Sequence, residues 1–352
     1  MSETRPPRPP RLSLARLPTP LQPSRALGAQ LGTTLFWKRD DLTGAELSGN
    51  KIRKLEFLLA EAEAEGADTV VTCGAEQSNH CRATAFAAAQ RGLSCVLVLR
   101  VADPAAPPAP AANSLLDRIA GADVRYVSVA DYQRREDILA DIAAELRRAG
   151  QRPYVIPEGA SSALGAWGYA HAVEELREQL AALGPAVAQR PVTIAYACGS
   201  GGTGAGLELG LRLTGWRDAR AIGFAVCDDR AHFQRTIAAL VTEASRRWRL
   251  GVSIAPEDIA IDDRFVRATL STTSTSMSVS MLTAIQTVGR SEGLVLDPVY
   301  TAKAFLGLTE TLAGDGAMRG GTVVFMHTGG IFGLFPFGPD LVPPATPNPA
   351  NL

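Results

Sequence analysis

Short runs of apolar residues alternate along the chain with longer stretches in which apolar and polar residues mix at helical spacing. Strand-like runs are expected at 69–74, 95–100, 124–129, 154–159, 192–199, 221–227 and 321–330. Helices are expected at 51–62, 80–92, 114–120, 134–149 and 163–183, from 203 and from 231. Strands that alternate with helices form parallel sheets with helices on both faces. Two such runs predict an α/β fold with two doubly wound open twisted sheets.

Composition narrows the class of protein. With 352 residues, 46% hydrophobic and 20% charged, the chain suits two ordinary globular domains. Its formal charge of −1 gives no electrostatic case for nucleic acid or a membrane surface. No apolar run approaches the ~20 residues of a membrane helix, and the basic, proline-rich start lacks a signal-peptide core. Five cysteines without metal-ligand spacing predict free thiols, no metal and a cytoplasmic protein.

Three loops rich in glycine or amide side chains follow predicted strands, at 73–80, 197–206 and 326–333. Ligands of doubly wound sheets bind at the carboxyl ends of the strands. We therefore expect the three loops to converge on one cleft. The middle loop, "GSGGTGAG" from Gly199, could bind an anion through its backbone N–H groups and the following helix N-terminus. It lacks the Gly-Lys-Ser/Thr of a P-loop, so the phosphate of a small cofactor and a plain tight turn remain the two interpretations.

Lysine is rare in this chain, with four residues among 35 basic ones: Lys38, Lys51, Lys54 and Lys303. An aldehyde cofactor needs an amine that can lose its proton, which arginine cannot do. Lys51 follows the turn "SGN" and begins a predicted helix, so its amine could reach a cleft. Local sequence alone favours an exposed lysine at a helix start.

Two further segments carry chemistry. In "EQSNH" (76–80), Ser78 or Asn79 could bind a ligand or cap the next helix, and the two roles are compatible. In "LDPVYTAK" (296–303), Tyr300 could protonate a substrate or pack in the core. Taken alone, the second segment favours an aromatic residue packed in the core.

Several motifs in one order resemble the aminocyclopropanecarboxylate deaminase and D-cysteine desulfhydrase family of pyridoxal-phosphate enzymes. They are "FWKRDDLTGAELSGNKIRKLEFLLAEA", "GAEQSNHCRATA", "IPEGASSALGAWGYAHAVEEL", "GSGGTGAGLELGL", "LDPVYTAKA" and "HTGGIFGLF". The resemblance covers roughly residues 11 to 336 and implies the tryptophan synthase β-subunit fold, fold type II. It predicts a large cofactor-binding domain of residues 1–55 and 165–352 and a small domain of residues 56–164, with the cofactor between them.

The resemblance also implies how pyridoxal 5'-phosphate is held. Lys51 would carry the cofactor as a Schiff base, Asn79 would hydrogen-bond its ring hydroxyl, and Thr301 would face the pyridine nitrogen. The phosphate would lie on the backbone of Gly199, Ser200, Gly201, Gly202 and Thr203.

Substrate and catalytic roles follow from the same resemblance. Ser78, Asn79 and His80 would lie near the substrate carboxylate, and Thr328 and Gly329 would close the cleft. The catalytic residues would be Lys51, Ser78 and Tyr300.

Two positions favour the desulfhydrase side of the family, which includes cysteate sulfo-lyases. Thr301 stands where the deaminases carry an acid, and His80 stands where they tend to have glutamine. The chain also departs from the family, because no tyrosine follows Asp262 and Asp263. A wall of Ser and Thr at 271–276 would instead favour a polar substrate group.

The predicted function is α,β-elimination of a small amino acid, yielding a 2-oxo acid, ammonia and a leaving group. A D-cysteine desulfhydrase-like or cysteate sulfo-lyase-like enzyme is the leading hypothesis. The alternatives are a β-replacement synthase, a ring-opening or otherwise specialised deaminase, and a non-catalytic cofactor-binding homologue. The resemblance further implies a homodimer.

Overall fold

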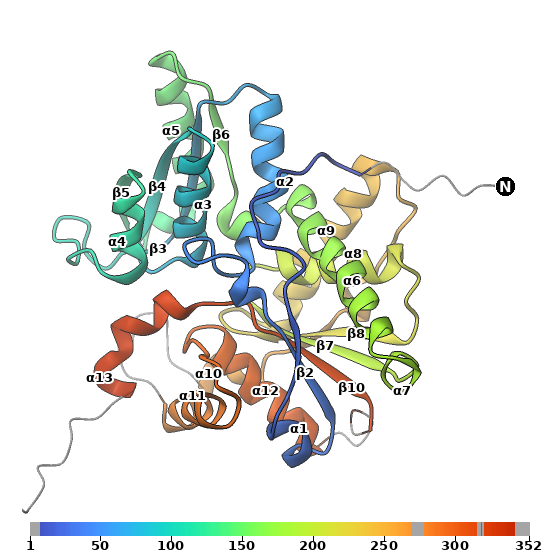
Figure 1. Cartoon of the computed structure of the whole chain (residues 1–352). Helices are drawn as coiled ribbons and strands as arrows, with labels where there is room; N and C mark the ends of the chain where they lie inside the picture. Colours follow the sequence, from blue (N-terminus) through green and yellow to red (C-terminus); the bar gives the residue numbers. More distant parts are fainter. Residues whose placement is uncertain (1–7, 269–277, 315–317, 319, 342–352) are drawn as a thin grey trace, which may run out of the picture.

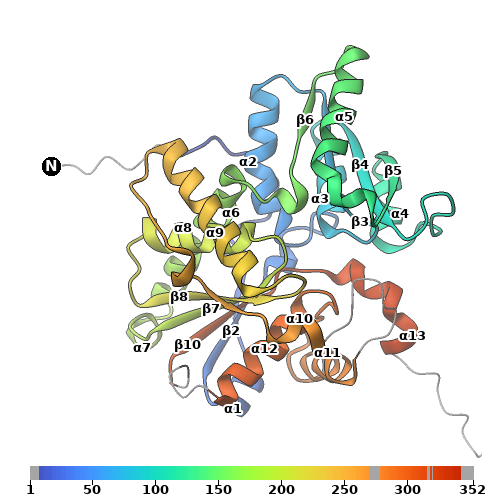
Figure 2. The same ribbon diagram turned by 180° about the vertical axis from the view of Figure 1, so that it is seen from behind.

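The computed structural model describes residues 8–268, 278–314, 318 and 320–341. Two open sheets stand one above the other in Figure 1, and the turned view of Figure 2 shows the same separation. The larger sheet has the order β1 (Leu21–Pro23), β2 (Thr34–Lys38), β10 (Thr322–Met326), β7 (Val192–Cys198), β8 (Ala219–Ala225), β9 (Ala260–Asp262). All of its pairings are parallel except that between β1 and β2.

The smaller sheet is parallel throughout and has the order β5 (Asp123–Ser128), β4 (Ser94–Val101), β3 (Thr69–Ala75), β6 (Pro153–Val155). Leu97 and Leu99 of β4 pack on the side of α3 (Asn79–Gln90), whereas Val96 and Val98 pack on the side of α5 (Arg135–Arg148). Successive side chains of a strand point to opposite faces, so this strand needs apolar residues at consecutive positions. A sheet buried on both faces explains its continuous apolar run.

Helices likewise cover both faces of the larger sheet (Figures 1 and 2). One face carries α2 (Lys51–Ala64), α6 (Ala163–Ala182), α8 (Gly202–Leu213) and α9 (Arg230–Trp248). The other carries α1 (Leu27–Gln30), α11 (Val279–Glu292) and α12 (Thr301–Gly314). The remaining helices are α4 (Ala112–Ile119), α7 (Pro185–Ala188), α10 (Arg264–Ala268) and α13 (Gly338–Leu341). Short 3-10 turns are η1 (Asp40–Leu42), η2 (Asp131–Arg134), η3 (Glu158–Ala160), η4 (Pro256–Asp258) and η6 (Ile331–Phe337).

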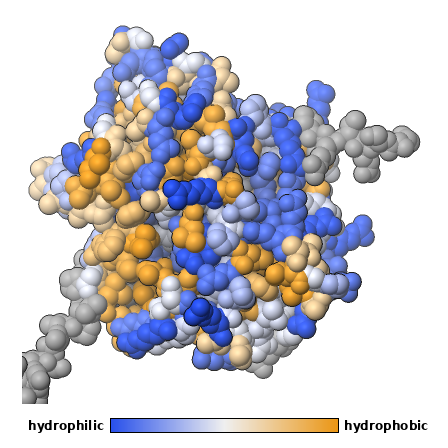
Figure 3. All heavy atoms as spheres, viewed as in Figure 1, coloured by the Kyte–Doolittle hydropathy of each residue, from blue (hydrophilic) through white to orange (hydrophobic). Residues whose placement is uncertain are grey.

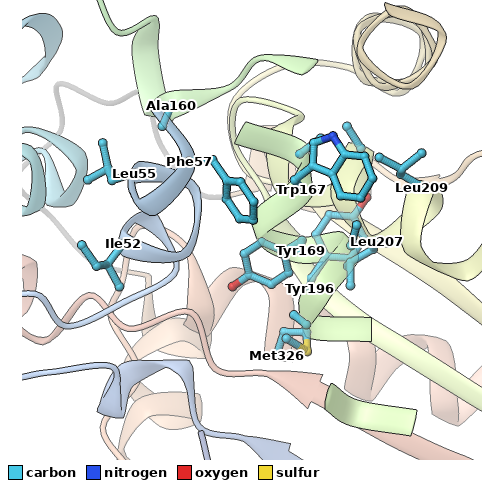
Figure 4. Packing of buried hydrophobic residues seen from close by; sticks show 14 of the residues in the cluster. Ile52, Leu55, Phe57, Ala160, Trp167, Tyr169, Tyr196, Leu207, Leu209 and Met326 are labelled. Atoms are coloured by element: carbon cyan, nitrogen blue, oxygen red, sulfur yellow. The ribbon is translucent and has the colours of Figure 1, made fainter. Parts of the chain in front are cut away.

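The core beneath α2 determines where this helix begins. Phe57 of α2 packs near Trp167 and Tyr169 of α6, as Figure 4 shows. The two helices approach closely at Gly168, where a Cβ atom would come 2.4 Å from the carbonyl oxygen of Arg53. Only glycine permits that approach, because any side chain would push α2 outward. The sequence "LGAWGYA" therefore positions the helix that starts at Lys51.

The predicted α/β class is confirmed, and the predicted strands and helices appear within a few residues of their expected bounds. The pattern of apolar residues did not predict β1, β2 and β9 of the larger sheet, because these strands are short or carry few β-branched residues. The domain boundaries at 55 and 165 stay a prediction. The Ser/Thr wall expected at 271–276 lies outside the described residues. None of the helices in the described ranges is long and apolar enough to cross a membrane.

Candidate active site

The turn before Lys51 is held by the loop that follows β10. Gly49 has φ +112°, and a Cβ atom there would lie 2.9 Å from the carbonyl oxygen of Thr328. The same oxygen accepts a hydrogen bond from the backbone N–H of Asn50 at 3.1 Å. A Cβ atom at Gly329 would lie 2.8 Å from the Cα of Gly49. The "SGN" and "HTGG" segments thus meet backbone to backbone, and this contact fixes the turn from which Lys51 starts.

Lys51 is half-buried, and its amine loses a proton more easily than that of an ordinary lysine. Burial lowers its pKa to about 8, although the negative charge of Glu158 raises it in part. A Cβ atom at Gly159 would lie 3.2 Å from its Nζ, so the amine lies against η3. Within the described part of the chain, Nζ has no hydrogen-bond partner. This is the state that a nucleophilic lysine requires.

The other three lysines are already engaged. Lys38 pairs with Glu175 in a buried network, and Lys303 donates to the carbonyl oxygen of Val226 at 3.1 Å. Lys54 donates to the carbonyl oxygen of Gly159 at 3.3 Å. Lys51 is therefore the lysine best suited to react.

Lys54 has a position that the sequence analysis did not predict. A Cβ atom at Gly202 would lie 2.9 Å from its Nζ, which places this amine at the start of α8. The side chain is fully buried, and burial together with the nearby charge of Lys51 lowers its pKa well below the usual value. A buried amine in this position calls for an anion. Its spacing of three residues from Lys51, which places both on one helix face, was the available signal.

The glycine loop fits that anion. Gly201 has φ +78° and leads into α8, whose first turn has no side-chain cap. Ser200 shares a hydrogen bond of 2.8 Å between hydroxyl oxygens with Ser161. Asn50 donates from Nδ2 to the hydroxyl of Thr203 at 3.1 Å. Backbone amides at a helix N-terminus beside a lysine are well suited to bind a phosphate group.

The loop after β3 faces the same region. Ser78 caps α3, since its hydroxyl accepts from the N–H of Cys81 at 3.2 Å. A Cβ atom at Gly74 would come 2.5 Å from the Ser78 Oγ, so the strand end must be glycine. The Oδ1 of Asn79 accepts from the Nδ2 of Asn113 at 3.0 Å. Capping by Ser78 is confirmed, whereas its catalytic role stays a prediction.

The ring of His80 is used inside the molecule. Its Nε2 lies 2.8 Å from the hydroxyl of Thr72, which donates its only proton to the carbonyl oxygen of Ile156. Nε2 is therefore the protonated nitrogen and donates to Thr72. Burial and the charges of Lys51 and Lys54 hold the pKa of His80 well below its usual value. Contact between this neutral ring and a substrate carboxylate stays a prediction.

Tyr300 packs against the glycine loop, because a Cβ atom at Gly199 would lie 3.0 Å from its Cε1. Burial and then the charge of Asp297 raise the pKa of its hydroxyl, which stays protonated at neutral pH. Such a hydroxyl can donate a proton in a closed cleft.

Thr301 already has a partner within the protein. Its hydroxyl donates to the Oδ1 of Asp297 at 2.7 Å and accepts from the N–H of that residue at 2.7 Å. The single hydroxyl proton is thus committed to Asp297. The predicted contact of Thr301 with a pyridine nitrogen stays a prediction, and as placed the hydroxyl would have no proton to donate there.

A family model described as pyridoxal-phosphate dependent enzyme matches residues 12–329. A mitochondrial bifunctional D-cysteine desulfhydrase/1-aminocyclopropane-1-carboxylate deaminase of Arabidopsis thaliana is 40% identical over 334 residues, covering 92% of this chain and 79% of that relative. A D-cysteine desulfhydrase of Klebsiella pneumoniae is 37% identical and covers 94% of this chain and 97% of its own length.

Solved structures show the same relationship. The crystal structure of an ACC deaminase homologue matches with a TM-score of 0.83, 37% identity and coverage of 95% of both chains. A fungal L-serine ammonia-lyase from Rhizomucor miehei shares the fold, with a TM-score of 0.64, 19% identity and coverage of 94% of this chain and 100% of that chain. The predicted fold class, two open α/β sheets of the fold type II pyridoxal-phosphate enzymes, is confirmed.

Proposed function

Because the chain belongs to the family of pyridoxal-phosphate-dependent enzymes, we propose that it catalyses α,β-elimination from a small amino acid. The products would be a 2-oxo acid, ammonia and the leaving group from the β-carbon. The observation that carries this proposal is the Lys51 amine, which has a pKa of about 8, lies against η3 and has no hydrogen-bond partner among the described residues. Relatives named D-cysteine desulfhydrase support the choice of reaction.

The residues of the cleft fit the cofactor of this family. Lys51 would carry it, Lys54 and the loop of Gly199, Ser200, Gly201, Gly202 and Thr203 would hold its phosphate, and Asn79 would face its ring oxygen. Bound pyridoxal phosphate supplies an electron-withdrawing ring that makes the α-proton of an attached amino acid acidic. The buried, uncompensated amine of Lys54 supports the phosphate assignment, because it lacks a carboxylate partner in the described ranges.

Two groups of the chain would move protons in the reaction. The Nζ of Lys51 would take the α-proton, since an amine with a pKa of about 8 is close to the working range of a general base. The protonated hydroxyl of Tyr300 would then protonate the departing group. The Ser78–His80 loop and the Thr328–Gly329 loop would hold the substrate carboxylate.

Opening of a cyclopropane ring is a second candidate, favoured by the names of the Arabidopsis relative and of a Pyrococcus horikoshii relative, a putative 1-aminocyclopropane-1-carboxylate deaminase that is 39% identical. Thr301 disfavours this reaction, because it would place a neutral hydroxyl, and no acid, opposite the ring nitrogen of the cofactor. β-Replacement and cofactor binding without turnover remain alternatives that the same experiment tests.

We also propose that the protein works as a homodimer in the cytoplasm. The amphipathic helix α4 exposes Leu115 and Ile119, and the nearby η6 exposes Phe335. Figure 3 shows apolar side chains gathered on that side of the molecule. The cysteines are free thiols, which suits a reducing compartment. Analytical ultracentrifugation would measure the mass in solution, and a monomer would contradict the dimer.

The test of the proposed reaction compares the wild type with Lys51→Ala and with Lys303→Ala as a matched buried lysine. Each protein is loaded with pyridoxal phosphate and given D-cysteine, L-cysteine, cysteate or 1-aminocyclopropane-1-carboxylate. We expect a visible cofactor band and 2-oxo acid from a β-substituted substrate in the wild type and in Lys303→Ala, and neither in Lys51→Ala. Product from the cyclopropane substrate alone would establish the deaminase. A band without any product would contradict elimination.

A further inference from the structure

Asn113 joins α4 to the loop that faces the cofactor cleft. Its side chain is fully buried, although it lies at the start of an otherwise half-exposed helix. Its Nδ2 donates to the carbonyl oxygen of Gln77 at 3.0 Å and to the Oδ1 of Asn79 at 3.0 Å. Its backbone N–H donates to the Oε1 of Gln77, also at 3.0 Å. The contacts cross more than 30 residues of sequence and end on the side chain expected to face the cofactor ring.

The hydrogen bonds of Arg82 determine which way the Asn113 amide points. The Nε of Arg82 donates to the Oδ1 of Asn113 at 3.0 Å. A guanidinium group can only donate, so the atom of Asn113 that faces it must be the oxygen. The nitrogen of Asn113 therefore faces Asn79, and the atom of Asn79 that meets it must accept. Asn79 consequently presents its oxygen to Asn113 and keeps Nδ2, with both protons, for another partner.

Arg82 itself is held rigidly. It is fully buried, its Nη2 donates to the carbonyl oxygen of Ser48 at 2.7 Å, and its Nη1 donates to the carbonyl oxygen of Glu46. The ring of Phe332 covers the guanidinium at 4.9 Å. Because residues 46 and 48 lie just before Lys51, one side chain ties the Lys51 turn to the orientation of the Asn79 amide.

We propose that Asn113 is a positioning residue that sets the hydrogen-bond polarity of Asn79, so that Asn79 offers an N–H donor to the ring oxygen of the cofactor. The proposal rests on the proposed function in one respect, namely that Asn79 faces that oxygen. A donor in this place favours the ionised form of the oxygen, whereas an acceptor favours the protonated form. Arg82 fixes the orientation of the Asn113 amide, and Asn113 in turn fixes the orientation of the Asn79 amide.

The decisive variant is Asn113→Asp, which has nearly the same shape. A carboxylate still accepts from the Nε of Arg82, but it cannot donate to Asn79. The Asn79 amide should turn over, donate to the new carboxylate and present its oxygen to the cofactor ring. We expect the population of bound cofactor with an ionised ring oxygen to fall about tenfold relative to the protonated form, a shift of about one pKa unit.

The readout is the ratio of the long-wavelength to the short-wavelength absorption band of bound pyridoxal phosphate, followed against pH without substrate. Ser114→Ala is the matched control, because Ser114 is the next buried residue and its hydroxyl contacts Ala111, Glu76 and Gln77 but not Asn79. A shift in Asn113→Asp with none in Ser114→Ala would support the proposal. An unchanged ratio in Asn113→Asp, or equal shifts in both variants, would overturn it.

Three further outcomes are interpreted as follows. If Asn113→Asp does not fold, Asn113→Ala decides: a smaller shift in the same direction supports the proposal, and an unchanged ratio overturns it. If the folded wild type binds no pyridoxal phosphate, the proposed function fails together with this inference. If the wild type shows the cofactor band and the Asn113 variants have the same band ratio as the wild type, this inference fails while the proposed function stands.

Discussion

Lys54 lies one helical turn after Lys51, and both amines lie beside η3. The amine of Lys54 donates to the carbonyl oxygen of Gly159, whereas the amine of Lys51 lies near the same glycine without a hydrogen bond inside the described ranges. Each positive charge disfavours the other in this buried place. A phosphate at the glycine loop would pair with Lys54 and offset its charge.

Covalent attachment of the cofactor should depend on pH through Lys51. Its pKa of about 8 means that the neutral amine becomes about tenfold rarer for each pH unit below that value. The attachment rate, measured by absorbance after mixing the cofactor-free protein with pyridoxal phosphate, should rise to about pH 8 and then level off. Glu158→Gln removes a charge that raises this pKa, so its profile should move to lower pH. A profile that Glu158→Gln leaves unchanged would refute the assignment.

Lys54→Met should separate stability from phosphate binding. The apolar side chain replaces a buried amine whose charged form is disfavoured, so the cofactor-free protein should become more stable. It also removes a charge-assisted contact, and affinity for pyridoxal phosphate should fall about tenfold or more. Thermal unfolding with and without the cofactor measures both effects. Lys303→Met, which changes another buried lysine, should keep the wild-type affinity. Equal losses in both variants would contradict a phosphate role for Lys54.

Asp117 should make folding less favourable as the pH rises. Its carboxylate is fully buried, both oxygens lack a hydrogen-bond partner among the residues that the structure describes, and burial raises its pKa to about 7. Because the folded pKa lies above the unfolded value, the folded state holds the proton more tightly. The free energy of unfolding therefore has its full contribution from this group below about pH 4. It falls by about 4 kcal/mol as the pH rises from there through about 7. The free energy of unfolding of Asp117→Asn, measured with urea, should not show this decline. If the variant and the wild type decline in parallel with pH, Asp117 is not the group responsible.

Arg53 and Asp40 form a fully buried ion pair, with hydrogen bonds of 2.9 and 2.8 Å. Arg53→Met would leave the carboxylate of Asp40 buried without its main partner, and unfolding should become about 3–5 kcal/mol easier. Arg125→Met removes an exposed pair with Glu145 and should change stability by less than about 1 kcal/mol. Urea midpoints compare the two variants. Equal changes would mean that burial does not amplify the Arg53 pair.

Much of the fold could be predicted because its strands are buried on both faces. "TVVTCG" and "CVLVLR" are continuous apolar runs, and such runs bounded by helices are typical of parallel strands. The strand β1 is three residues long, and one of them is a proline. It forms because it pairs with β2, where Leu21 lies opposite Lys38. No local pattern predicts such an edge strand, since its stability comes from its neighbour.

The candidate site was partly predictable for a related reason. Glycines and amides after strands marked the loops, and the scarcity of lysine pointed to Lys51. The sequence did not reveal that Lys54 reaches Gly202 or that Asn113 reaches Asn79. These contacts join residues on different helices that are distant in the sequence, so they depend on how the helices pack. The closed environment of His80, whose ring donates to Thr72, was equally hidden.

The sequence alone determined the alternation of strands and helices, the glycine-rich turns and the family to which the chain belongs, because these depend on local periodicity and on motifs in order. The tertiary structure decided the strand orders, the burial that lowers the pKa of Lys51, and the amide polarity that runs from Arg82 to Asn79. Burial and hydrogen-bond direction are properties of the neighbours in space. They exist only once distant segments have packed together.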